Sequence, residues 1–287
     1  MAEAGSQSPH LEEEQKRQAE KSAPLRATVI HEVIRDEGEA DIELGLATLL
    51  WSGLAAGLSM GFSYATQALL KSQLPEAPWA HPIAAFGYVV GFAIVVLGRQ
   101  HLFTESTLSA LLPTLIRRDR QTVQKTLRLW SVVLAANIVG TWIFAAVLAF
   151  ANPLGPDAVA SLGSLSAESM ANGFGETLVR AVFAGWLIGL MVWLLPTAGP
   201  SKILIIALLT WVVALGRFSH IIAGSSEAAY GVFTGHAGFA DYGLRFFIPT
   251  LIGNLIGGAA LVAMLNHAPV REEMEGADEP EAEIPPQ

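Results

Sequence analysis

The sequence Gly98-Arg99-Gln100-His101-Leu102-Phe103-Thr104-Glu105 interrupts a hydrophobic stretch at residues 83–116, and Gly216-Arg217-Phe218-Ser219-His220 interrupts another at residues 203–233. Each stretch is too long for one membrane span, which needs about 20 apolar residues. The parts of the first stretch on either side of its interruption would measure only roughly 22 Å and 16 Å as helices, against a hydrocarbon core of about 30 Å. We therefore expect each stretch to cross the membrane once, as two half-helices joined by a loop.

These interruptions place non-helical backbone at membrane depth. Such backbone is tolerated only where it is buried in protein or lines an aqueous cavity. A matched pair of interrupted segments, one in each half of a chain, is the best pointer in a sequence to a transport pathway. The two interruptions therefore predict a channel or transporter.

The apolar stretches predict six spans in two related halves. The unbroken spans are expected at residues 44–70, 129–151, 178–196 and 246–266. Gly98-Arg99 recurs as Gly216-Arg217, and Asn137-Ile138-Val139-Gly140 recurs as Asn254-Leu255-Ile256-Gly257. Likewise, Gly53-Leu54-Ala55-Ala56-Gly57-Leu58 resembles Gly185-Trp186-Leu187-Ile188-Gly189-Leu190. Because each half holds three spans, the second half enters from the opposite side, which gives an all-α integral membrane fold with an inverted 3+3 repeat.

Charge is concentrated at the two ends of the chain. The composition is 52% hydrophobic and 15% charged, against about 25% charged in soluble domains. The first 43 residues carry 11 acidic and 5 basic side chains, and residues 271–287 carry 7 acidic and 1 basic. We expect an acidic cytoplasmic segment at 1–43, a transmembrane domain at 44–267 and a disordered acidic tail at 268–287.

Lysine and arginine lie mostly on one predicted side of the membrane. The side that holds both termini has Lys16, Arg17, Lys21, Arg26, Arg35, Arg117, Arg118, Arg120, Lys125, Arg128, Lys202 and Arg271. The loops of the other side have Lys71 and Arg245. Basic loops stay in the cytoplasm. We therefore expect both termini to be cytoplasmic, in a multi-pass protein of the inner membrane.

Several further features narrow the class of protein. The apolar residues Leu25, Val29, Ile30, Val33 and Ile34 repeat at helical spacing, which predicts an amphipathic helix at the cytoplasmic surface. A membrane-docked leader is the simpler interpretation of this helix, and a cap over the pore is the alternative. The chain has no cysteine, which excludes disulfides and thiolate metal sites. No aromatic-interleaved basic patch suggests nucleic-acid binding.

Five ionisable side chains cluster at the interruptions. They are Arg99, His101, Glu105, Arg217 and His220, and Gln100, Thr104 and Ser219 add neutral polar groups. A charge at the centre of a membrane helix costs at least ~2.5–3.5 kcal/mol, so each of these residues is a functional candidate. The positive N-terminal ends of the second half-helices would favour an anion between them.

His220 is the main candidate, because histidine can be neutral or cationic near physiological pH. In an apolar pore it could give a proton to a weak-acid anion, which would then cross as the neutral acid. A purely structural histidine is the alternative.

The remaining candidates are assigned structural roles. We favour a bond from Arg99 and Arg217 to the free carbonyls of the preceding half-helices, with a positive field along the pathway as the alternative. We expect Glu105 to pair with one of these arginines. Asn137 and Asn254 are expected to bond the interrupted backbone. Gly98, Gly216 and Gly224 are expected to shape the breaks.

At these residues the chain resembles the formate/nitrite transporter family over residues 44–266. The resemblance rests on Leu102-Phe103-Thr104, on Phe218-x-His220 with Ile222-Ala223, and on Gly253-Asn254-Leu255-Ile256-Gly257-Gly258. It implies a homopentamer of aquaporin-like protomers that conduct small monovalent anions such as formate, nitrite, hydrosulfide or lactate, often with protons.

The resemblance also implies roles for single residues. Leu102 and Phe103 match one apolar constriction, Phe218 matches the other, and Thr104 faces His220. The chain departs from the family in having Gly224 after Ala223, in Arg99-Gln100-His101 before Leu102, and in Glu105. It therefore looks like a divergent branch.

Other functions remain open. A neutral-solute channel would be expected to carry Asn-Pro-Ala at the half-helix starts, which this chain lacks. A non-conducting sensor or scaffold would keep the fold without the pore. A metalloenzyme could use His101, Glu105, His220 and Glu227, but no His-Glu-x-x-His pattern is present. We expect no enzyme activity, no cofactor and no metal, with a small anion, protons and the lipid bilayer as partners.

Overall fold

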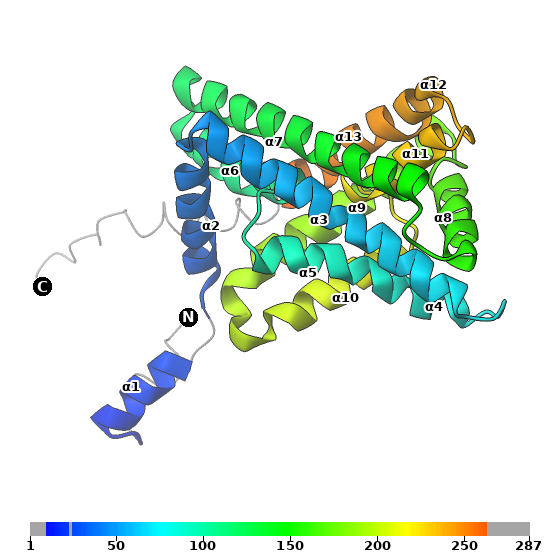
Figure 1. Ribbon diagram of the computed structural model, residues 1–287. Coiled ribbons are helices and arrows are strands. Elements are labelled where there is room, and N and C mark those ends of the chain that lie inside the picture. Colours follow the sequence, from blue (N-terminus) through cyan, green and yellow to red (C-terminus); the bar gives the residue numbers. More distant parts are fainter. Residues whose placement is uncertain (1–9, 23–24, 263–287) are drawn as a thin grey trace, which may run out of the picture.

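The computed structural model describes residues 10–22 and 25–262, and all regular elements of these residues are helices (Figure 1). The predicted tail 268–287 lies outside the described residues. The elements are α1 (Glu13–Ser22), α2 (Ala27–Ile42), α3 (Leu46–Ser72), α4 (Ala80–Ala85), η1 (Phe86–Tyr88), α5 (Val89–Leu97), α6 (Phe103–Arg117), α7 (Arg120–Ala146), η2 (Val147–Ala151), α8 (Pro156–Ser169), α9 (Phe174–Leu194), η3 (Leu195–Thr197), η4 (Gly199–Ser201), α10 (Lys202–Leu215), α11 (Ala223–Phe233), α12 (Phe239–Asp241), η5 (Tyr242–Phe247), α13 (Ile248–Asn254) and η6 (Leu255–Val262).

Four helices of the described chain are long and apolar enough to cross a membrane: Leu46–Ser72, Ala80–Leu97, Arg120–Ala151 and Phe174–Thr197. A shorter apolar helix runs over Gly199–Leu215. The helix that ends at Leu97 begins three residues before its predicted start at 83, because α4, η1 and α5 follow one another without a gap.

Both predicted interruptions are loops between helices. The first separates α5 from α6, and the second separates α10 from α11. The second half-helices begin at Phe103 and Ala223. The interrupted helices therefore form two matched pairs.

The first half-helices end in the same hydrogen-bonded motif. After α5, the Arg99 amide donates to Val96 O (3.2 Å) and the Gln100 amide to Val95 O (3.0 Å). These crossed bonds form a Schellman motif, whose left-handed residue is usually glycine. Here that residue is Arg99, with φ of 51°, whereas Gly98 has an ordinary right-handed conformation.

The second break repeats this motif. The amides of Arg217 and Phe218 donate to the carbonyls of Ala214 (3.1 Å) and Val213 (2.9 Å). Arg217 has φ of 52°, and Gly216 is again right-handed. The strained position therefore falls on an arginine in both halves.

The long helices pack in corresponding pairs, α3 along α7 and α9 along α13 and η6. A Cβ atom on Gly57 would lie 2.2 Å from Asn137 O, and one on Gly185 would lie 2.4 Å from Asn254 O. These contacts pair Gly57 with Gly185, so aligning Gly53 with Gly185 was wrong by one helical turn. Glycine recurs every four residues in this region, and the sequence alone could not fix the turn.

α2 lies against protein, on one side of the helical body, and α8 lies at the opposite end (Figure 1). α2 packs on α6 and buries Ile30, Ile34, Gly38 and Ile42. A Cβ atom on Gly38 would lie 1.9 Å from Ser109 O, so the two helices touch through backbone. The other predicted apolar positions of the amphipathic helix, Leu25, Val29 and Val33, are exposed.

Candidate transport site

One buried asparagine holds the loop of the first break. Asn137 Oδ1 accepts from the Phe103 amide (2.9 Å), and its Nδ2 donates to Gly53 O (2.7 Å) and His101 O (3.0 Å). The side chain thereby links α7, α3 and the loop, and it occupies the first free amide of α6.

Asn254 does the same in the second break. Its Oδ1 accepts from the Ile221 amide (2.8 Å), and its Nδ2 donates to Ala181 O (2.8 Å) and Ser219 O (2.9 Å). The correspondence between the two halves therefore extends to single hydrogen bonds.

His220 lies where the two breaks meet. Its side chain is buried, with Nε2 2.8 Å from Thr104 Oγ1 and Nδ1 3.2 Å from the Ala223 amide nitrogen. Because a backbone N–H can only donate, Nδ1 accepts, and the proton of the neutral ring lies on Nε2, directed at Thr104. The ring also makes an edge contact with Phe92, at 5.1 Å between centroids. The site thus holds a neutral imidazole as a hydrogen-bond donor in apolar surroundings.

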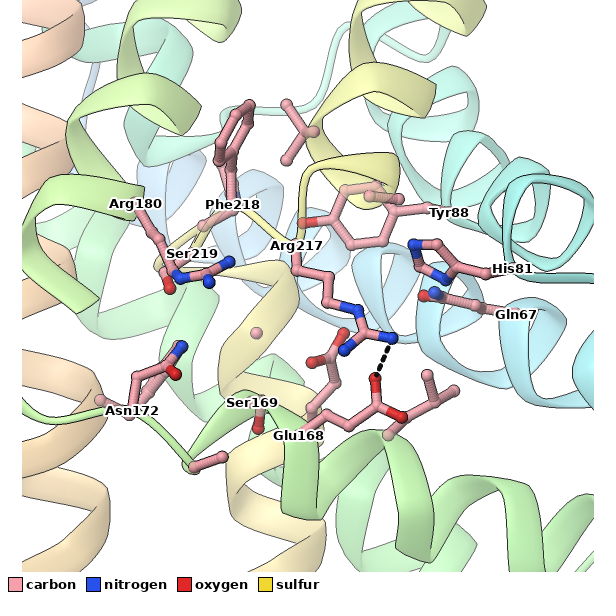
Figure 2. A pocket seen from close by; sticks show the side chains of 18 residues that line it. Gln67, His81, Tyr88, Glu168, Ser169, Asn172, Arg180, Arg217, Phe218 and Ser219 are labelled. Carbon is pink, nitrogen blue, oxygen red and sulfur yellow. Dashed lines mark ion pairs between the residues drawn. The ribbon is translucent and has the colours of Figure 1, made fainter. Parts of the chain in front are cut away.

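A cavity of about 160 Å³ reaches His220 from the α8 side. Figure 2 shows Arg180 and Asn172 on one wall, His81 and Gln67 on the other, and Arg217 between them. The cavity therefore brings polar side chains to the buried histidine.

Thr104, Leu102 and Phe103 are buried and do not line the cavity. Thr104 is bonded to His220, which does line it. Leu102 and Phe103, the apolar side chains of the first break, are thus not exposed to the cavity.

A second cavity of about 490 Å³ adjoins the first. The two share Gln67, His81 and Arg217, and the second extends to Lys71 and Asp157. Polar and charged groups thus continue from His220 outward beneath α8.

The arginines of the breaks bond carboxylates of other elements. Arg217 lies 3.6 Å from Glu168 of α8, as Figure 2 shows, and Arg99 lies 3.2 Å from Glu37 of α2. Both arginine side chains are more than half exposed, at 56% and 84%. The prediction that they bond the preceding carbonyls was wrong, because backbone amides of the Schellman motifs already take carbonyls at these helix ends.

Glu105 does not pair with either arginine, so this prediction was also wrong. Its Oε1 is buried without a hydrogen-bond partner, as is Oε1 of Gln100. His101 turns to its neighbours: the Ser52 hydroxyl bonds both its amide (3.0 Å) and its Nδ1 (2.8 Å), and Nε2 lies 3.3 Å from Asp41 of α2. The side chains of Arg99 and His101 are therefore held by α2 and α3.

Aromatic rings pack against two of the predicted glycines. The Phe218 ring stacks on Phe183, with 5.3 Å between ring centroids. A Cβ atom on Gly216 would lie 2.7 Å from the Phe218 ring. A Cβ atom on Gly224 would lie 2.7 Å from the ring of Phe246. Phe218 and Ser219 both line the cavity.

The four residues considered for a metal site are separated. His101 is bonded to Ser52 and Asp41, whereas His220 and Glu227 line the cavity. Within residues 10–22 and 25–262, no group of three or more histidine, aspartate or glutamate side chains is placed to hold a metal ion.

Sequence reasoning missed several partners of the site, among them Phe92, Ser52, Asp41 and Glu168. Each lies far along the chain from the residue it contacts, so no local pattern marks it. The helix that carries Glu168 did have a signal, because Pro156 occupies its first turn after Gly155.

Two interrupted helices that meet at a buried histidine beside a polar cavity define a membrane channel or transporter. A family model described as Formate/nitrite transporter matches residues 28–268. The chain belongs to this family, which confirms the predicted resemblance and makes it a channel or transporter and not an enzyme.

Individual proteins are also similar to this chain in sequence. "Inner membrane protein YfdC" of Escherichia coli (strain K12) is 39% identical over 259 residues, covering 90% of this chain and 84% of that protein. "Formate channel BtFdhC" of Bacillus thuringiensis is 26% identical over 242 residues, covering 81% and 91%.

Solved structures share the fold. A "Pentameric formate channel with formate bound" matches with a TM-score of 0.67 at 17% identity, over 78% of this chain and 96% of that chain. An "FNT family ion channel" matches with a TM-score of 0.75 at 15% identity, over 84% and 99%. These matches confirm the predicted all-α channel fold.

Proposed function

We propose that the protein conducts a small monovalent weak-acid anion, of the formate or nitrite kind, across the inner membrane. The observation that carries this proposal is the contact between His220 Nε2 and Thr104 Oγ1 (2.8 Å), at the end of a polar cavity and between the two helix breaks. The relative called a formate channel and the formate-bound structural neighbour support the substrate class.

In the finer mechanism, His220 serves as the central proton donor and the anion crosses as the neutral acid. Nε2–H would turn from Thr104 to the arriving anion and form a charge-assisted hydrogen bond. Complete transfer of that proton requires a ring that carries a second proton, and Nδ1 accepts that proton only if the Ala223 amide gives up its bond.

Apolar side chains would discriminate against the charged form. Leu102 and Phe103 are at most 2% exposed, and Phe218 lines the cavity. A bare ion cannot enter such surroundings without a large desolvation cost, whereas a neutral acid can. In this proposal the constrictions therefore select for the protonated substrate.

We further propose a homopentamer with both termini in the cytoplasm. The structural neighbour described as pentameric supports the assembly, and the excess of Lys and Arg on the predicted terminal side supports the orientation. The α2 side would then face the cytoplasm and the α8 side the exterior. Exposed apolar side chains such as Trp51 (73%), Phe150 (72%) and Leu204 (68%) would meet lipid or neighbouring protomers.

The test is flux into proteoliposomes that contain an internal pH dye, after pulses of formate, nitrite, acetate or lactate. We expect anion-dependent acidification that His220→Asn and Thr104→Ala change strongly. His81→Asn is the matched control, because His81 lines the same cavity without a role in the proposal. If folded, oligomeric protein carries none of the four anions, the proposal fails, and neutral solutes or a sensory role take its place.

A further inference from the structure

Glu227 is an acidic side chain at the cavity that the mechanism above leaves without a task. It lies on α11, one turn beyond Gly224, and both residues line the cavity together with His220. The Gly224 amide donates to His220 O (2.9 Å), so Glu227 and His220 belong to one continuous piece of backbone. Both side chains therefore line one cavity from neighbouring parts of this backbone.

The cations of the cavity are already paired with other carboxylates. Arg217 lies 3.6 Å from Glu168, and Arg180 lies 2.8 Å from Glu176. Glu168 also binds Lys71 of the adjoining cavity, at 3.0 Å. Among the hydrogen bonds and ion pairs of the described residues, none involves Glu227, so its carboxyl faces the cavity without a counter-charge.

Ionisable side chains surround Glu227 from several elements of the fold. They are Tyr64 of α3, His81 of α4, Tyr88 of η1, Glu168 of α8, Arg180 of α9, Arg217 and His220 of the second break, Tyr230 of α11 itself and Tyr242 of η5. The tyrosines are neutral, the arginines are engaged and Glu168 is negative. An uncharged carboxylic acid is much cheaper to hold in this place than an unpaired carboxylate.

We propose that Glu227 is the proton donor that converts the weak-acid anion into the neutral acid on the α8 side. This inference rests on the proposed transport of a weak acid, and it assigns to Glu227, in place of His220, the proton that neutralises the anion. The O–H bond of the Glu227 carboxyl breaks, a new O–H bond forms on the anion, and Glu227 is left as a carboxylate. A hydronium ion from the outer solution then returns the proton to Glu227.

This assignment gives His220 a task that its geometry already fits. The Ala223 amide occupies Nδ1, so the ring stays neutral and offers Nε2–H as a hydrogen-bond donor. His220 would thus hold and orient the anion, while Glu227 supplies the proton that removes its charge.

The test is formate-driven acidification of proteoliposomes at external pH from about 5.5 to 7.5. We expect Glu227→Gln to lower the rate at least about tenfold at the acidic end and to remove its dependence on external pH. Asp157→Asn, which changes a carboxylate of the adjoining cavity, is expected to keep both the rate within about twofold and the pH profile. Glu227→Asp should be slower but keep the pH dependence.

The outcomes separate the two proposals. If wild-type protein carries formate and Glu227→Gln matches its rate and pH profile, this inference fails while the proposed function stands. A faster Glu227→Gln variant would also overturn it, because the carboxyl would then merely repel anions. If wild-type protein carries no weak acid, both fail. Should Glu227→Gln not assemble, a Glu227→Asp profile without pH dependence would count against the inference.

Discussion

The two helix breaks share one backbone design but differ in what covers them. Each ends in a Schellman motif with an arginine in the left-handed position, and each is held by an asparagine with three hydrogen bonds. The first break is covered by α2, whose Glu37 and Asp41 contact Arg99 and His101. The second break opens into the cavity beneath α8.

This difference separates what the repeat determines from what the added segments determine. The repeat fixes the two loops and brings Thr104 to His220. The two segments outside the repeat make different contacts: α2 packs on α6 and bonds Arg99 and His101, whereas α8 lines the cavity that reaches His220. The surroundings of each break are therefore set by an element that the repeat does not contain.

The largest expected effect tests whether both breaks depend equally on their asparagines. Asn137→Ala and Asn254→Ala each remove three hydrogen bonds to buried backbone groups, which should cost about 3 kcal/mol or more of unfolding free energy. Thermal unfolding in detergent measures this loss. Asn172→Ala, at the edge of the cavity, is the control. If either Asn137→Ala or Asn254→Ala unfolds at the wild-type temperature, the two breaks do not depend equally on their asparagines.

The close helix contacts should be equally sensitive in both halves. Gly57→Ala and Gly185→Ala place a methyl group against the backbone of the partner helix, and each should lose about 1–3 kcal/mol. Gly163→Ala is the control, since nothing lies within 4 Å of its Cβ position in α8. This variant should gain up to about 1 kcal/mol from better helix propensity. Equal stability of all three variants would contradict the packing described.

The bond between the breaks can be tested at Thr104. Thr104→Ala removes the acceptor of the His220 Nε2–H and should cost about 1–3 kcal/mol, because a buried donor loses its partner. Thr104→Ser keeps the hydroxyl and should lie closer to wild type in thermal unfolding. The reverse order would show that the methyl group matters more than the hydrogen bond.

The arginines in left-handed conformation allow a comparison of backbone strain. Arg217→Gly and Arg217→Ala both remove the contact with Glu168, so their difference reports the backbone alone. Glycine should be more stable than alanine by about 1 kcal/mol. The pair Arg99→Gly and Arg99→Ala should give the same difference in the first break. A clear inequality between the two pairs would show that the loops are held differently.

The smallest expected effect is a pH-dependent loosening of the α2 side. A hydrogen bond from Lys125 holds the pKa of the Glu43 carboxyl below its usual value. A carboxyl with a lowered pKa adds stability above its unfolded pKa and loses it as the pH falls through the folded pKa. Proteolysis of α2 should therefore increase on acidification, and Lys125→Ala should weaken this dependence. An identical dependence in wild type and variant would count against the contact.

The sequence was sufficient to predict both breaks and the asparagines near them, because these features are local. Polar runs inside long apolar stretches mark the breaks, and the repeated Asn-x-x-Gly marks the third helix of each half. The charged contacts were not predictable. Arg99 and Glu105 lie in the same break, yet the partners of Arg99 and Arg217 come from α2 and α8.

The register of the repeat was lost for a different physical reason. Gly53, Gly57, Gly185 and Gly189 all offer the same small surface at one-turn spacing, so two alignments satisfy the sequence equally well. Only the positions of the asparagine carbonyls distinguish them. The docking of α2 was likewise ambiguous, because Ile30 and Val29 are equally apolar but face opposite surroundings.

The asparagine that ties each loop to two helices also gives a means of recognising distant sequences. Its side chain must both accept and donate a hydrogen bond, which an amide of this length can do. Its backbone carbonyl lies against a glycine of the neighbouring helix. Asn137 follows Gly98 by 39 residues, and Asn254 follows Gly216 by 38. A search pattern built on this doubled spacing would detect chains of the same architecture even where every side chain along the conduction route had been replaced.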